Sequence, residues 1–179
     1  PAYSSTGTLA WLSMERDGYE SDKNDIIVLK GSEKINLTKD WDGTVSGFIW
    51  SADAKTIYFT VSVDGTKQVF KVNYDKNAPV VTQITKGEFD IRSIVGQSGN
   101  KLVVNRTDMN HANELFTVDL KIRALTRLTN VNKDFYSKIG MSKVEKRIIK
   151  TADEQAMLVW VIYPPNFDAS KKYPTTLYC

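Results

Sequence analysis

Side chains able to act as nucleophiles or bases are scarce in this sequence. The segment Gly96-Gln97-Ser98-Gly99-Asn100 matches Gly-x-Ser-x-Gly, the turn that presents a nucleophilic serine, everywhere except at Asn100. That turn joins a strand to a helix, whereas residues 96–100 stand between two strand-like runs. We therefore predict an ordinary turn here and no catalytic serine.

The single histidine and the single cysteine add no chemistry of their own. His111 lies in the polar segment Asp108–Asn113 and would need a partnered nucleophile to act in catalysis. One histidine and Cys179 cannot form a thiol–imidazole metal cluster. Asp40-Trp41-Asp42-Gly43 begins like a calcium loop but lacks the later ligands and the closing glutamate. We predict a solvated loop histidine, a connecting turn at residues 40–43, and no catalytic residue, metal or cofactor.

A repeat of 44 to 48 residues organises the chain. The strand-like run at residues 8–13 recurs at 56–61 and 101–106, and a second run follows each of them at 25–29, 68–72 and 114–118. Each unit closes on an aliphatic residue and a threonine: Thr38, Thr85 and Thr129, spaced by 47 and 44 residues. Four short strands with this period are typical of a β-propeller blade. We predict an all-β, partial propeller of about three four-stranded antiparallel blades.

Composition excludes several classes of protein. The net charge is only +3, and its 24 basic and 21 acidic residues are interleaved, so no basic patch for nucleic acid is visible. No apolar run is long enough to span a membrane, and no signal peptide is recognisable. The 41% hydrophobic and 25% charged residues are ordinary for a globular domain.

The pattern changes after about Lys143. Residues 144–150 and 156–163 read as two strands joined by a turn, the second of them long, apolar and stopped by Pro164-Pro165. Residues 175–179 read as the start of another buried strand. We predict a domain boundary here, with blades in residues 1–143 and a second, barely begun domain in residues 144–179.

Three segments resemble the prolyl oligopeptidase family of serine peptidases, in the branch of acylaminoacyl peptidases and dipeptidyl peptidase V. Residues 51–59 are similar to the Ser-Pro-Asp-Gly-Lys element that opens blades there, departing from it at Ala52 and Ala54. Residues 11–22 look like a blade segment of that branch, and residues 157–165 with 172–174 resemble the lead-in to the hydrolase domain. The resemblance implies the last blades of a propeller followed by the first strands of an α/β-hydrolase.

The same resemblance implies what the chain lacks. The oxyanion-hole turn, the nucleophile elbow and the triad acid and histidine of that family have no counterpart in residues 1–179. Acyl transfer needs all of these groups, so this stretch alone should not hydrolyse peptides. We expect it to gate and orient oligopeptides for a parent serine exopeptidase, dipeptidyl or acylaminoacyl, and the resemblance places that enzyme in the periplasm or outside the cell.

The resemblance also suggests which residues face the substrate. In dipeptidyl peptidases of the family, charged propeller residues hold the free N-terminus of the peptide. A carboxylate can pair with that ammonium through a charge-assisted hydrogen bond. Glu15, Arg16 and Glu20 lie in a charged stretch between two predicted strands and are our substrate-facing candidates, although a solvated hairpin also explains such a charge run.

Other interpretations stay open at this stage. A periplasmic propeller that binds or scaffolds protein partners would explain the repeat, but it has no use for the hydrolase lead-in at residues 144–179. A self-contained β-sandwich would alternate without the repeat. Three blades alone leave two outer faces bare, so the sequence also suggests self-association as a way to cover them.

Overall fold

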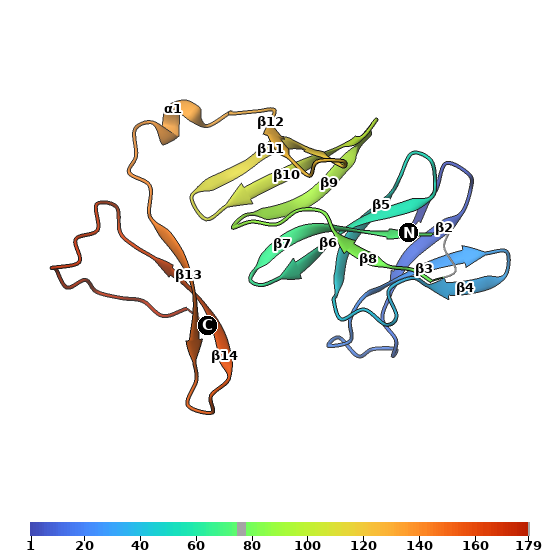
Figure 1. Cartoon of the computed structure of the whole chain (residues 1–179), viewed down its shortest axis with the longest axis horizontal. Helices are drawn as coiled ribbons and strands as arrows, with labels where there is room; N and C mark the ends of the chain where they lie inside the picture. The colour runs from blue at the N-terminus through green and yellow to red at the C-terminus, as the bar shows by residue number, and fades with distance from the viewer. Residues whose placement is uncertain (75–77, 179) are drawn as a thin grey trace. The chain divides into compact units, whose positions relative to one another are not determined.

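The computed structural model describes residues 1–74 and 78–178. The chain divides after Val131 into two compact units, residues 1–131 and 132–179. Figure 1 shows the three sheets of the first unit and the hairpin of the second. In the described residues, no helix has the length and apolar character needed to cross a bilayer.

Three four-stranded antiparallel sheets make up the first unit, each with its strands in chain order. The first blade contains β1 (Ala2–Tyr3), β2 (Leu9–Ser13), β3 (Asp25–Lys30) and β4 (Glu33–Asn36); the middle blade contains β5 (Val45–Trp50), β6 (Thr56–Val63), β7 (Thr66–Asn73) and β8 (Val81–Gln83); the third blade contains β9 (Asp90–Ser98), β10 (Lys101–Asp108), β11 (His111–Asp119) and β12 (Leu125–Arg127). These sheets confirm the predicted all-β class and the three repeats.

Tight turns with left-handed residues join neighbouring strands of the blades. Asp64 and Gly65 both have positive φ, 49° and 70°, and join β6 to β7 with Val63 paired to Thr66. Such two-residue hairpins match the twist of the strands they connect. Gly99, with φ of 55°, lies in the turn between β9 and β10. The segment that partly matches a nucleophile elbow is therefore a strand-to-strand turn.

The turn that precedes β6 has an alanine, Ala54, where the similar Ser-Pro-Asp-Gly-Lys element has glycine. Ala54 adopts φ of 58°, in the left-handed region that favours glycine. Ser51 Oγ donates to Asp53 Oδ1 at 2.6 Å and accepts from the amide of Thr56 at 2.9 Å. These side-chain hydrogen bonds hold the turn although an alanine occupies its strained position.

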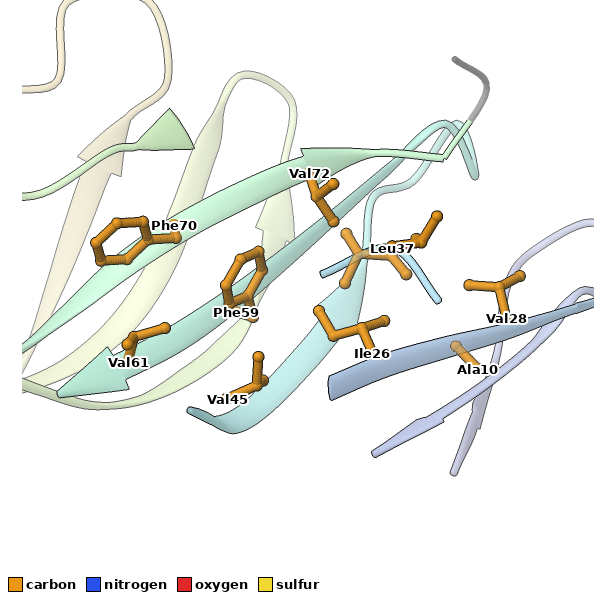
Figure 2. Close-up of a cluster of buried hydrophobic side chains, with 10 residues drawn as sticks. Ala10, Ile26, Val28, Leu37, Val45, Phe59, Val61, Phe70 and Val72 are labelled. Atoms are coloured by element: carbon orange, nitrogen blue, oxygen red, sulfur yellow. The ribbon is translucent and has the colours of Figure 1, made fainter. Parts of the chain in front are cut away.

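Two hydrophobic clusters lie between successive blades. The first joins the first and middle blades, and Figure 2 shows Ile26, Val28 and Leu37 on one side with Phe59 and Val72 on the other. The second joins the middle and third blades through residues Tyr58, Val69, Ile84, Ile91, Leu102, Val104, Phe116 and Val118. Burial of these faces against each other provides the main apolar contribution to the fold.

A polar lock closes each blade, and it explains the recurring threonines. In each, the threonine hydroxyl accepts a hydrogen bond from a backbone amide of the blade's third strand, at 3.0, 2.8 and 2.9 Å for Thr38, Thr85 and Thr129. The same hydroxyl donates to the residue just before that amide. We call these three pairs the closing locks: Asp25–Thr38, Gln68–Thr85 and Glu114–Thr129.

The second unit carries α1 (Lys133–Tyr136) and a hairpin of β13 (Val144–Lys150) and β14 (Ala156–Ile162). None of the described residues 132–178 is buried. Glu145 accepts hydrogen bonds from Arg147 and Tyr163 at 2.9 and 2.7 Å, which lower the pKa of its carboxyl to about 2.

One predicted strand is wrong. Residues 175–178 form no strand, and Leu177 and Tyr178 are almost fully exposed; the last residue of that prediction, Cys179, lies outside the described residues. The physical reason is that a strand is stabilised by hydrogen bonds to a neighbour, and no sheet of the described chain includes this segment. The predicted hydrolase domain and its boundary after residue 143 stay predictions.

Candidate functional site

The connections between the second and third strands of the three blades lie at corresponding ends of their sheets. This follows from the shared strand order and antiparallel alternation. In the middle blade the connection is the two-residue turn at Asp64, and in the third it is a short turn before His111. In the first blade it is a loop of residues 14–24, which contains all three predicted substrate-facing residues.

Arg16 closes this loop by binding Asp22. Its Nε donates to Asp22 Oδ2 at 3.0 Å, its Nη2 contacts Oδ1, and its backbone amide donates to Oδ2 at 3.1 Å. Its guanidinium carbon also lies 3.7 Å from the centre of the Tyr19 ring. Hydrogen bonding raises the pKa of Arg16 and lowers that of Asp22, so both stay charged. Arg16 is therefore a structural clamp.

The clamp leaves the acidic residues of the loop exposed. Glu15, Asp17 and Glu20 are all exposed, and within the described residues no hydrogen bond or ion pair engages the side chain of Glu15 or Glu20. Residues 14–24 carry four carboxylates against two cations, a net charge of −2. We call residues 14–22 the acidic loop. An exposed set of carboxylates on a closed loop can bind an ammonium group.

His111 is the first residue of β11, beside the turn. Its Nδ1 lies 2.7 Å from Asp108 Oδ1, and the same carboxylate oxygen accepts from the amide of Asn110 at 2.9 Å. The hydroxyl of the neighbouring Thr107 donates to the His111 carbonyl at 2.5 Å. The His111 side chain and the Thr107 hydroxyl therefore stabilise the hairpin turn. The His111 side chain is about one third exposed.

Arg106 of β10 forms a cation–π stack with two aromatic rings. Its guanidinium carbon lies 4.4 and 4.7 Å from the ring centres of Phe89 and Phe116. Burial lowers the pKa of Arg106, but the group stays a cation in any ordinary pH range. Arg127 contacts the same Phe116 ring at 5.1 Å. The stack joins the connection before β9 to the third blade.

The three predicted candidates differ in their contacts. Arg16 pairs with Asp22 in the loop, whereas no hydrogen bond or ion pair of the described residues engages the side chain of Glu15 or Glu20, and the role of all three toward a substrate stays a prediction. Neither the pairing of Arg16 with Asp22 nor a role for Lys23 or Asp25 was predicted from the sequence. Opposite charges six residues apart in a loop were the only sign of the clamp.

Comparison with known proteins gives relatives along the whole chain. No family model matches the sequence. Dipeptidyl-peptidase 5 of Porphyromonas endodontalis is 39% identical and that of Porphyromonas gingivalis 32% identical, each aligned over 100% of this chain and 26% of the relative. The chain thus spans about a quarter of the length of these curated relatives.

Solved structures share the fold. Acylaminoacyl peptidase of Pyrococcus horikoshii superposes with a TM-score of 0.70 at 19% identity, over 88% of this chain and 24% of that chain. The β-propeller domain of the Trilobed protease from Pyrococcus furiosus superposes with a TM-score of 0.55 at 19% identity, over 70% of this chain and 37% of the other. The repeated sheets are propeller blades.

Proposed function

Because this chain is a homologue of dipeptidyl-peptidase 5 along its whole length, we propose that it is the substrate-orienting propeller part of a serine exopeptidase of the prolyl oligopeptidase family. The alignment includes residues 144–179, which supports a peptidase over a scaffold propeller. Catalysis then depends on a serine, histidine and acid outside residues 1–179, and the hairpin of β13 and β14 begins the hydrolase domain. Export to the periplasm or beyond is part of the same proposal.

The acidic loop carries the substrate-binding part of this proposal. Glu15 and Glu20 are exposed carboxylates on a loop that the Arg16–Asp22 clamp keeps closed. The peptides that a dipeptidyl peptidase cleaves have a free N-terminal ammonium. We assign Glu20 and Glu15 to that ammonium, so that its position sets where the peptide is cut.

The test uses the full-length protein and two substrates of the same sequence, one with a free amine and one N-acetylated. Glu20→Gln and Glu15→Gln should each raise KM for the free-amine substrate, by about tenfold for the residue that contacts the ammonium. The acetylated substrate has no ammonium, so its kinetics should not change.

Glu33→Gln is the matched control, because Glu33 is exposed on the same blade at the opposite end of its sheet. Glu33→Gln should leave the kinetics of both substrates unchanged. If both loop variants bind the free-amine substrate as well as the unmutated protein does, the acidic loop is not the ammonium site.

A further inference from the structure

Lys23, at the base of the acidic loop, is held by four oxygen atoms. Its Nζ donates to the carbonyl oxygens of Thr38, Lys39 and Trp41 at 2.9, 2.8 and 2.8 Å, and lies 3.0 Å from Asp25 Oδ1. An ammonium has three N–H donors and no acceptor, so these oxygens use its full capacity. The side chain is two-thirds covered, with 33% exposed.

The three carbonyl oxygens around Lys23 belong to the connection between the first and middle blades, and the fourth oxygen belongs to Asp25 in β3. The Trp41 ring of this connection packs against Phe59 and Phe70 of the middle blade, with ring centres 5.7 and 5.4 Å apart. One residue after the lysine, the Asn24 carbonyl accepts from the Val45 amide at 3.0 Å. The base of the loop is thus bound to a segment that the core of the middle blade holds in place.

In the middle blade a strand residue, and no loop residue, binds the connection to the next blade. There Gln68 Nε2 donates to the carbonyls of Gly87 and Phe89 at 3.1 and 2.7 Å, while its Oε1 accepts from the Thr85 hydroxyl of the closing lock. The side chain of Gln68 therefore has two tasks, to form the lock and to bind the connection. In the first blade the tasks are divided between Asp25 in the strand and Lys23 in the loop, so the loop itself becomes part of the inter-blade contact.

We propose that Lys23 is a positioning residue, which fixes the acidic loop relative to the middle blade so that its carboxylates meet the substrate ammonium. The substrate part of this inference rests on the proposed function. Without the ammonium, the three carbonyls and the Asp25 carboxylate lose the one donor that they share. Within the described residues, the Thr38 and Trp41 carbonyls then keep only backbone donors, and Asp25 keeps only Thr38 and Asn36. The loop and the connection then separate, and the acidic loop loses its fixed place.

The experiment compares Lys23→Ala with Lys34→Ala in the full-length protein, since Lys34 is an exposed lysine on the same blade. Lys23→Ala should raise amide hydrogen exchange in residues 14–22. It should also raise KM for the free-amine substrate by about three- to tenfold, with kcat and the acetylated substrate unchanged. Lys34→Ala should change neither.

Chemical rescue keeps the test valid if the variant is poorly folded. Methylammonium can fill the vacated site and donate to its oxygens, whereas tetramethylammonium has no N–H group. Methylammonium should restore exchange protection and KM, and tetramethylammonium should not; Lys23→Arg, which retains donors, should stay close to the unmutated protein.

The outcomes separate the two proposals. Unchanged exchange in the acidic loop of Lys23→Ala, or equal rescue by both ions, overturns the positioning role. Raised exchange that methylammonium reverses, with KM unchanged for both substrates, supports the positioning role and overturns the assignment of the loop to the substrate ammonium.

Discussion

The middle and third blades have the same strand order and the same closing lock, yet they bury different numbers of faces. Five consecutive residues of β6, Ile57 to Val61, are buried, whereas β10 buries only Leu102 and Val104, two residues apart. Successive side chains of a strand point to opposite faces. The middle blade is therefore covered on both faces, and the third, among the described residues, on one.

The aliphatic residues that precede the lock threonines show the same difference. Leu37 and Ile84 are 4% and 6% exposed, each packed in the cluster between its own blade and the next. Leu128, at the equivalent position of the third blade, is 54% exposed. The repeat thus fixes the residue type, and the neighbouring blade decides whether that residue contributes to stability.

The largest expected effect is on stability, when the aliphatic residue before the lock threonine is truncated in the middle and third blades. Ile84→Ala should lower the free energy of unfolding by about 2–5 kcal/mol, because it leaves a cavity in a buried cluster. Leu128→Ala should cost less than about 1 kcal/mol, because its side chain is half in solvent. Urea unfolding of the two variants measures both, and equal losses would mean that Leu128 is covered in solution.

A smaller effect is expected at the lock of the third blade. Glu114 accepts from the Thr129 hydroxyl and, at 2.7 Å, from the amide of Val131. Glu114→Ala leaves these donors without their acceptor and should cost about 1–3 kcal/mol. Glu114→Gln keeps one acceptor oxygen, as Gln68 does in the middle blade, and should cost less in the same urea assay. Equal losses would show that the acceptor oxygen retained by glutamine adds nothing to stability, and no loss in Glu114→Ala would show the same of the whole lock.

The smallest effect is a difference in acid sensitivity between the locks of the first and middle blades. Burial raises the pKa of Asp25, but hydrogen bonds from Asn36, Thr38 and Lys23 outweigh it, so the pKa is lowered overall. A lowered pKa stabilises the fold above the unfolded value, about 3.9 for Asp, and this stability is lost as pH falls through the folded pKa. The amide of Gln68 does not titrate.

Asp25→Asn therefore makes the first lock resemble the middle one. The variant should be less stable than the unmutated protein at pH 7, with the difference shrinking below about pH 4. Thermal unfolding from pH 2 to 7 measures this difference. A constant difference over that range would show that the Asp25 carboxylate has no lowered pKa in the fold.

Local patterns were sufficient for the strands, because alternation, turn residues and spacing are properties of neighbouring residues. The period of the threonines and of the strand-like runs predicted the blades correctly. Residues 175–178 show the limit, since their apolar character predicted a strand, but no sheet of the described chain pairs with them. Strand formation depends on a neighbour as well as on the segment itself.

The position of the acidic loop was predicted from the sequence, but the contacts within it were not. Its location between two strands of the first blade followed from the charge run at residues 15–22. Whether a charge in it is free depends on which partner the folded loop brings within about 3 Å, and Arg16 meets Asp22 while Glu20 does not meet a cation.

The sequence by itself determined the strands and the position of the acidic loop, because these depend on residue types a few positions apart, and the blade repeat, because the same residue types recur every 44 to 48 residues. Only the tertiary structure decided that Arg16 is a clamp, that Lys23 lies among four oxygens, and that Thr38 locks onto Asp25. The physical reason is that the lysine and the threonine bind groups more than ten residues away along the chain. Such contacts exist only once the sheets have brought those segments together.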